Sequence, residues 1–523
     1  MSLACCLAAI LLALALHRRA QGGTLPLRPC FADLAALLAG VWVYALCFVL
    51  LGWPLAALTV TALALGGLWA VNEAKKASLR GEPLVITDLA LVWQVLRFPW
   101  LYLPFLPWRA MLVAGLAGIA LAVLACRLPA SPSSAGALWL ALALILPLAL
   151  ASMRLSALRP IAAAIERLLP LSFNARRDAE RYGPLGAALL HAAWHLALRG
   201  QPGCKGVPPL GALGQGRLPQ AWTRDCLRFD AGPGVRLPHI VLVQAESFCD
   251  PRPFSPAVPQ DILPCWDALR AGGMGGSFVT SAFGAYTLRT EYAVLSGQPW
   301  TALGTDAFHP YLGCARRPSW SLAWLLRDFG YRTVCLHPFH RGFFCRDRAI
   351  PNLGFERFAT LESFPQDRAF GPYVSDASVA QALLAELERA DARGRPLFCF
   401  AITMESHGPW LDGRFAREGG DRAAGVPDLP GLALPVRRYL THLAHADAML
   451  GALHEGLKAS DRPAVLGCYG DHLPNLQGFV PDRAKAAPWA VWPAPAGTAP
   501  GTRQDLAPDA MGGLLLEAGG LLR

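Results

Sequence analysis

Long apolar runs fill the first third of the chain. A helix needs about 20 apolar residues to cross a bilayer, and five runs reach or approach this length. They lie near residues 2–16, 33–52, 54–71, 111–126 and 135–153. We therefore predict an N-terminal α-helical transmembrane bundle of about five spans within residues 1–153. The first run could alternatively be the apolar core of a signal peptide, although no basic segment precedes it.

Two segments beside these runs carry a different pattern. Residues 72–110 begin with polar side chains and end rich in tryptophan and proline. Because aromatic residues favour the head-group layer of a membrane, we predict an interfacial segment there. Within residues 154–236, positions 161–169 have the spacing of a juxtamembrane amphipathic helix. The remainder alternates helical pieces with Gly/Pro-rich stretches, which are typical of a linker.

The pattern changes again at about residue 237. Short, continuous apolar runs now appear, as expected of buried parallel strands. They occupy residues 239–244, 332–336, 397–403 and 464–469, with helical patterns at 319–329, 376–392 and 436–459. Strands that alternate with helices predict an α/β domain over residues 237–523, with helices on both faces of its sheet.

Composition supports a membrane protein and argues against nucleic-acid binding. Of the 523 residues, 54% are hydrophobic and only 16% are charged, whereas a soluble protein carries about 25% charge. The net charge is +10, and residues 1–160 contribute 11 Lys/Arg against 4 Asp/Glu. This excess lies beside apolar segments, where basic residues meet anionic lipid head groups. No run of five basic residues appears, so nucleic acid is not an expected partner.

The 14 cysteines are scattered and show neither a CxxC pair nor a Cys/His zinc spacing. We interpret most of them as small buried hydrophobes. One or two disulfides remain open if the C-terminal domain lies outside the cytoplasm.

Carboxylates and imidazoles follow the predicted strands. In open α/β sheets, ligands bind beyond the carboxyl ends of the strands. The four strands are followed by Glu246, His337, His407 and the pair Asp471-His472. Such mixed oxygen and imidazole ligands suit Mn²⁺, Zn²⁺ or Mg²⁺, and a metal of this kind can activate a hydroxyl nucleophile. Thr287 follows a Gly-containing turn at a predicted helix start, where backbone N–H groups can hold a phosphate.

Several motifs in this half carry a family resemblance. They include Gln244-Ala-Glu-Ser-Phe, Thr287-Leu-Arg-Thr-Glu-Tyr-Ala-Val-Leu-Ser-Gly, His337 nine residues before Arg346-Asp347, Thr403-Met-Glu-Ser-His-Gly-Pro, and Gly470-Asp-His. In these motifs the chain resembles the lipoteichoic acid synthase and phosphoglycerol transferase group of the alkaline phosphatase/sulfatase superfamily. The resemblance runs from about residue 237 to the end and implies that superfamily's mixed sheet. The chain has no Cys-x-Pro-x-Arg, the formylglycine pattern, so a true sulfatase is disfavoured.

The resemblance implies a role for each candidate residue. Glu246, Thr287, Asp471 and His472 would hold one divalent metal, most simply Mn²⁺, with Mg²⁺ or Zn²⁺ as alternatives. Thr287 would be the nucleophile, and His407 a proton donor or anion contact. His337 and Arg346 would bind the substrate phosphate, with His340, Arg341 and Arg348 as rivals. Glu291 would either support the metal ligands or simply belong to the first turn of the helix, and we assign it no role. We find no acidic ligands for a second metal.

The resemblance also implies the reaction. Thr287 would attack the phosphate of phosphatidylglycerol, diacylglycerol would leave, and an envelope glycan or glycolipid would take the phosphoglycerol group. Phe344 stands where the Gram-positive synthases have tryptophan near the glycerol. A phosphoethanolamine transferase, a phosphodiesterase and a non-catalytic envelope-assembly module therefore stay open.

The implied location is the cytoplasmic (inner) membrane, as a multi-pass protein with its catalytic domain on the periplasmic or extracellular side. Five spans and a cytoplasmic N-terminus agree with this. The basic residues of loops 17–32 and 72–110 would then lie outside, whereas positive-inside counting favours the reverse. These loops could instead hold anionic lipid.

Overall fold

The computed structural model describes most of the chain. The described residues are 2–20, 31–79, 81–106, 108–125, 136–152, 167–197, 236–280, 284–365, 371–411, 428–481 and 486–522. The chain divides into two compact units, Met1–Gln201 and Pro202–Arg523, and each is described by itself.

The first unit is a helical bundle. Among the described residues, four helices are long and apolar enough to cross a membrane. They are α1 (Ser2–Ala20), α2 (Phe31–Leu51), α3 (Pro54–Ser78) and α6 (Trp108–Ala125). A fifth apolar helix, α7 (Gly136–Ser152), has 17 residues and would extend about 25 Å at 1.5 Å per residue. The predicted bundle of about five apolar helices is therefore confirmed.

Aromatic packing holds the centre of this bundle. Tyr44 and Phe48 of α2 lie against Trp139 of α7, with ring centroids 5.2 and 5.6 Å from that of Trp139. Leu11, Leu116 and other leucines of the bundle are exposed instead. A soluble protein rarely exposes such a continuous apolar surface, so these side chains fit contact with lipid.

Short helices follow α3 along the sequence. They are η1 (Ile86–Leu91), α4 (Val92–Arg97), α5 (Pro99–Tyr102) and η2 (Leu103–Phe105). Trp93 and Trp100 are exposed on them, as an interfacial segment requires. The predicted helix 161–169 lies largely outside the described residues. α9 (Ala175–Ala197), which packs against α2, consists of two helical segments that meet at Gly183 (φ 71°).

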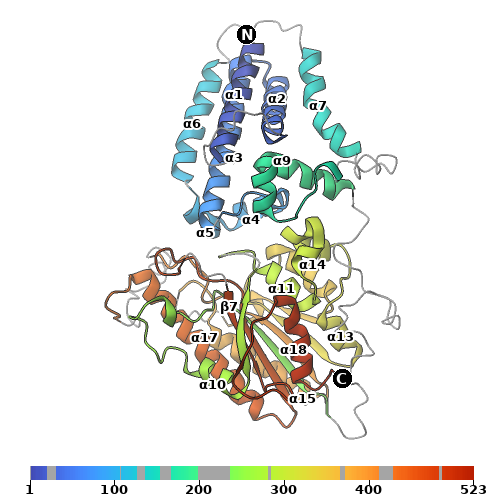
Figure 1. Ribbon diagram of the computed structural model, residues 1–523, viewed down its shortest axis with the longest axis vertical. Helices are drawn as coiled ribbons and strands as arrows, with labels where there is room; N and C mark the ends of the chain where they lie inside the picture. The colour runs from blue at the N-terminus through green and yellow to red at the C-terminus, as the bar shows by residue number, and fades with distance from the viewer. Residues whose placement is uncertain are drawn as a thin grey trace. The chain divides into compact units, whose positions relative to one another are not determined.

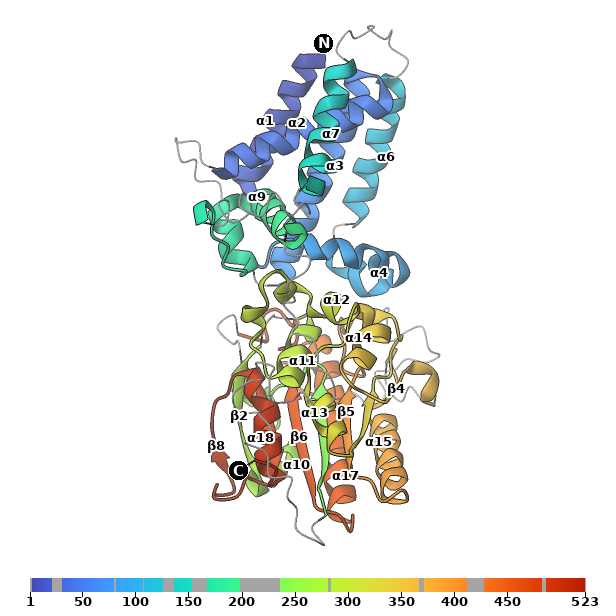
Figure 2. The same ribbon diagram turned by 90° about the vertical axis from the view of Figure 1, so that its right-hand side faces the viewer.

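The described part of the second unit forms a mixed sheet of eight strands in the order β4-β3-β5-β1-β6-β7-β2-β8. The strands are β1 (His239–Ala245), β2 (Met274–Val279), β3 (Arg332–Leu336), β4 (Arg357–Ala359), β5 (Leu397–Ile402), β6 (Ala464–Gly470), β7 (Ala486–Trp492) and β8 (Thr502–Arg503). The first five strands of this order are parallel, and β7 runs antiparallel to both of its neighbours. The predicted fold class is confirmed (Figures 1 and 2).

Helices cover both faces of this sheet. The longer helices are α10 (Pro264–Gly272), α11 (Thr287–Ser296), α13 (Leu322–Asp328), α15 (Asp376–Asp391), α17 (Leu434–Lys458) and α18 (Met511–Ala518). Shorter ones are α12 (Pro310–Cys314), α14 (Arg346–Asn352), η6 (Arg252–Phe254), η7 (Trp300–Phe308), η8 (Phe343–Cys345), η9 (Leu361–Ser363) and η11 (Pro508–Ala510).

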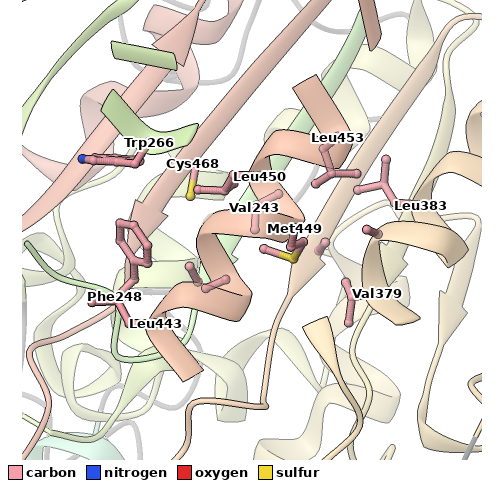
Figure 3. Packing of buried hydrophobic residues seen from close by; sticks show 14 of the residues in the cluster. Val243, Phe248, Trp266, Val379, Leu383, Leu443, Met449, Leu450, Leu453 and Cys468 are labelled. Carbon is pink, nitrogen blue, oxygen red and sulfur yellow. The ribbon is translucent and has the colours of Figure 1, made fainter. Parts of the chain in front are cut away.

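Side-chain alternation along β1 assigns its two faces. Val243 belongs to a buried cluster with Leu383 of α15 and Leu450 of α17, shown in Figure 3. Leu242, which points to the opposite face, adjoins Leu515 of α18 at Gly467. Burial of each such side chain stabilises the fold by roughly 1.5–3 kcal/mol, so both helical layers hold the strand ends in place.

Candidate active site

Two neighbouring strands bring the first group of candidate residues together. Strands β1 and β6 are parallel, and Ala245 pairs with Gly470 in their register. The next residues, Glu246 and Asp471, therefore leave the same edge of the sheet together, and His472 follows. One ligand atom from each of these three side chains lies within 4.8 Å of the others, and all three residues are buried.

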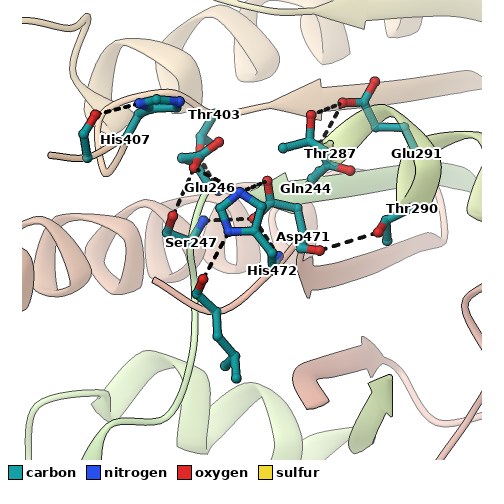
Figure 4. Close-up of polar contacts among 12 residues, drawn as sticks. Gln244, Glu246, Ser247, Thr287, Thr290, Glu291, Thr403, His407, Asp471 and His472 are labelled. Atoms are coloured by element: carbon teal, nitrogen blue, oxygen red, sulfur yellow. Dashed lines mark hydrogen bonds and ion pairs between the residues drawn. The ribbon is translucent and has the colours of Figure 1, made fainter. Parts of the chain in front are cut away.

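Hydrogen bonds orient this group inward (Figure 4). Asp471 Oδ1 accepts the backbone N–H groups of Ser247 and His472, both at 2.8 Å. Asp471 Oδ2 is buried and has no hydrogen-bond partner among the described residues. His472 Nδ1 lies 3.2 Å from the carbonyl oxygen of Leu473, which can only accept. Nε2 of His472 is thereby left as the acceptor atom, 3.6 Å from Glu246 Oε1 and 3.5 Å from Asp471 Oδ2.

Charge also favours a cation here. Burial raises the pKa of Glu246 well above its usual value, and the neighbouring Asp471 raises it further. Burial likewise raises the pKa of Asp471. Two adjacent buried carboxylates repel each other unless a proton or a cation lies between them. Together with the unpartnered oxygen and the oriented imidazole, this donor set fits a divalent metal.

Thr287 is the first residue of α11. The turn before it contains two left-handed residues, Gly284 (φ 68°) and Tyr286 (φ 57°). Glycine adopts this conformation at little cost, whereas tyrosine does so rarely. The half-buried Thr287 hydroxyl donates to Glu291 Oε1 at 2.9 Å and accepts from Arg346 Nη2 at 3.2 Å.

Glu291 is the centre of the network behind Thr287. Its fully buried carboxylate accepts from Gln244 Nε2 at 3.0 Å and from Tyr311 OH at 2.8 Å. Arg346 donates to both carboxylate oxygens through Nε and Nη2. Burial opposes ionisation of Glu291, but the charge and hydrogen bonds of Arg346, together with the hydrogen bond from Tyr311, outweigh it and lower the pKa of Glu291.

His337 completes this network. Its Nε2 lies 3.3 Å from Arg346 Nη1 and its Nδ1 lies 3.3 Å from the carbonyl oxygen of Ile402. Arg346 can only donate and the carbonyl can only accept. Burial, assisted by the charge of Arg346, lowers the pKa of His337 to about 3. His337 is therefore a neutral imidazole whose Nε2 accepts a hydrogen bond from Arg346.

The rival residues make contacts of a different kind. His340 packs on Phe339, with ring centroids 5.0 Å apart, and Arg341 lies over the ring of Phe358. Arg348 contacts Asp347 instead. Among the three arginines that the sequence left open, Arg346 donates a hydrogen bond to Thr287.

His407 lies apart from Thr287. Its Nδ1 is 2.7 Å from the carbonyl oxygen of Gly408, and its ring packs on Tyr373 at 5.7 Å. In Figure 4, His407 and Thr287 flank the Glu246 group on opposite sides. The Thr287 hydroxyl and the His407 imidazole therefore lie on opposite sides of the Glu246, Asp471 and His472 group.

Sequence reasoning assigned no part to Gln244, Tyr311 or Ser247. Gln244 did give a signal, because a polar residue inside a continuous buried strand requires a partner. Tyr311, on the short helix α12, gave no comparable signal.

Gly470 occupies a position where a side chain has no room. A Cβ atom there would lie 2.1 Å from the carbonyl oxygen of Phe248. We expect Gly470→Ala to destabilise the domain by about 1–3 kcal/mol and to weaken metal binding by displacing Asp471. Gly342→Ala, whose Cβ meets nothing within 4 Å, is the matched control. Thermal unfolding and metal titration of both variants would test this, and equal behaviour would contradict it.

Comparisons with known proteins find a family for this chain. A family model described as Sulfatase matches residues 238–505, just over half of the chain. The capsular polysaccharide biosynthesis protein RkpI of Rhizobium meliloti is 34% identical over 324 residues, which cover 62% of this chain and 54% of that protein. A protein of the same organism, provisionally assigned to cyclic β-1,2-glucan modification, is 29% identical over 240 residues, or 46% of this chain and 36% of that protein.

A similar solved structure is the lipoteichoic acid synthase LtaP of Listeria monocytogenes. It has 20% identity and a TM-score of 0.46, and the match covers 55% of this chain and 73% of that one. This chain spans about half or less of the length of each of the two Rhizobium meliloti relatives.

The mixed sheet, with an acidic and imidazole cluster at the carboxyl ends of its parallel strands, defines an α/β domain of the alkaline phosphatase kind. The chain belongs to the sulfatase family, and the predicted family resemblance is confirmed. Members of this superfamily are metal-dependent, in keeping with the Glu246, Asp471 and His472 group.

Proposed function

We propose that the chain is a membrane-anchored, metal-dependent transferase that moves phosphoglycerol from phosphatidylglycerol to an envelope glycan or glycolipid. The observation that carries this proposal is the half-buried Thr287 hydroxyl at the start of α11. It is hydrogen-bonded to Glu291 and Arg346. The same domain contains the buried Glu246, Asp471 and His472 group, which suits a divalent metal. A hydroxyl prepared in this way is typical of a covalent nucleophile.

Glu246, Asp471 and His472, with the Thr287 oxygen, would hold the metal, which we propose to be Mn²⁺. When bound, it would polarise the phosphoryl oxygens and acidify the threonine hydroxyl. The donor set, which combines two carboxylates, one hydroxyl and one imidazole, is dominated by oxygen and therefore suits Mn²⁺ or Mg²⁺ better than a thiolate-seeking metal.

The reaction has two displacements. The Thr287 hydroxyl would lose its proton to solvent, and its oxygen forms a bond to phosphorus while the bond from phosphorus to the diacylglycerol oxygen breaks. We propose that a protonated His407 gives diacylglycerol its proton, a role supported by its position on the side of the Glu246 group away from Thr287. An acceptor hydroxyl then attacks the phosphorus and gives its proton to His407, while the bond from Thr287 to phosphorus breaks and Thr287 takes up a proton from solvent.

Arg346 and His337 act behind the nucleophile in this proposal. Arg346 donates a hydrogen bond to Thr287, and the ring nitrogen Nε2 of His337 contacts Arg346. A guanidinium at this position can also stabilise charge that develops on the phosphoryl oxygens.

The relatives support an acceptor in the cell envelope. One is named for capsular polysaccharide biosynthesis and another for cyclic β-1,2-glucan modification. We therefore propose a surface polysaccharide or glucan as acceptor. With the four long helices and α7 all spanning the membrane, a cytoplasmic N-terminus would place the catalytic domain on the periplasmic or extracellular side of the inner membrane.

Release of diacylglycerol tests the donor. The full chain in detergent, with Mn²⁺, is given labelled phosphatidylglycerol or phosphatidylethanolamine. We expect release from phosphatidylglycerol alone and its loss after chelation, since the metal acidifies the nucleophile. Release from phosphatidylethanolamine alone would identify a phosphoethanolamine transferase instead, and the absence of release from both lipids would overturn the proposal.

A further inference from the structure

A second group of metal-ligating side chains lies outside the site above. Glu405 follows β5, and His442 and His445 are three residues apart on α17, so they share one face of that helix. One ligand atom from each residue lies within 4.8 Å of the others. Glu405 Oε1 is 3.2 Å from His442 Nδ1 and 2.6 Å from His445 Nδ1. Glu405 and His442 are each 1% exposed.

A buried carboxylate beside this group lacks a partner. Asp376, the first residue of α15, is 0% exposed, and neither of its carboxylate oxygens has a hydrogen-bond partner among the described residues. Its backbone N–H donates to Glu405 Oε2 at 2.6 Å, so the two acidic residues are direct neighbours. An uncompensated buried carboxylate is strongly unfavourable, and a bound cation would compensate it.

We propose that Glu405, His442 and His445 form a second divalent-cation site, which binds Zn²⁺ and whose charge compensates the neighbouring carboxylate of Asp376. Two imidazoles and carboxylate oxygens form a common zinc donor set. The Glu246 group has one imidazole, whereas this one has two, so the two sites differ in metal preference. The proposal does not depend on the transfer reaction.

The position of the second site indicates what its cation would do. Glu405 is two residues before His407, on the loop that leaves β5. The same loop is attached to α17 further along, where Arg438 Nη1 donates to the carbonyl oxygen of Trp410 at 3.2 Å. Trp410 also packs on Tyr439, with ring centroids 5.2 Å apart. A cation at Glu405 would fix this loop to α17 and α15, and thereby hold His407 in place.

Counting zinc tests this proposal without any activity assay. The detergent-purified full chain is stripped with a chelator, reloaded with Zn²⁺ and freed of excess metal, and its zinc content is measured by elemental analysis. We expect two zinc ions per wild-type chain, one in Glu405→Gln and His445→Ala, and two in His454→Ala. His454 is also on α17 but packs against Trp492, so it is the matched control.

Glu246→Gln separates the two sites, because it should lose the other zinc ion and keep this one. Thermal unfolding adds a second readout. His445, whose side chain is 39% exposed, can be replaced with little loss of packing. Zinc should raise the unfolding temperature of Glu246→Gln, whereas Glu246→Gln/His445→Ala should lose that increase. A zinc content that both Glu405→Gln and His445→Ala leave unchanged would overturn the proposal.

Discussion

Alanine at Thr287 should lower diacylglycerol release at least about a thousand-fold, because removal of a covalent nucleophile leaves only the residual effect of binding and charge stabilisation. Thr287→Ser should keep measurable release, since it retains a hydroxyl that can meet Glu291 and Arg346. The same samples should show the covalent step directly. Mass spectrometry of wild-type protein quenched with phosphatidylglycerol should find phosphoglycerol on the peptide that contains Thr287.

The control for this prediction is another hydroxyl of the same helix. Ser296 ends α11, and its Oγ accepts the backbone N–H of Gln298. Ser296→Ala should fold and release diacylglycerol at the wild-type rate. Undiminished release by Thr287→Ala, or an adduct on a different residue, would exclude Thr287 as the nucleophile. Metal content measured on each variant distinguishes a lost nucleophile from a lost metal.

Parallel strands are the part of the fold that sequence patterns predicted best. β1, β3, β5 and β6 are continuous apolar runs because helices bury both of their faces. β2 begins Met-Gly-Gly and β7 contains Pro488, and neither composition resembles a buried parallel strand. The antiparallel part of the sheet was therefore missed.

The same physical rule explains which site residues could be grouped in advance. Glu246 and Asp471 are 225 positions apart, yet both directly follow parallel strands, so their meeting at one sheet edge was predictable. The interactions of Glu291 were not predictable, since Tyr311 and Arg346 reach it from short helices without a regular pattern. Nor did the sequence indicate that Glu405 would meet two histidines of α17. The sequence analysis therefore found no acidic ligands for a second metal.

The ion pair of Glu291 and Arg346 should couple stability to catalysis. Both side chains are almost fully buried, and removal of one partner leaves the other charge uncompensated, which costs about 3–5 kcal/mol. Glu291→Gln and Arg346→Met should each lower the free energy of unfolding by that amount. The double variant should lose less than the sum of the single losses, since replacement of both charges removes the uncompensated one.

An exposed ion pair provides the control for these single and double variants. Glu455 pairs with Lys458 at 3.1 Å, but its side chain is 71% exposed, so Glu455→Gln should cost less than about 1 kcal/mol. Denaturant unfolding of all variants measures these losses, and diacylglycerol release measures the effect on Thr287. The double variant should recover stability without recovering release, because Thr287 would still lack its guanidinium and carboxylate contacts. Recovery of both would show that the pair supports the fold alone, whereas strictly additive losses of stability would contradict the coupling.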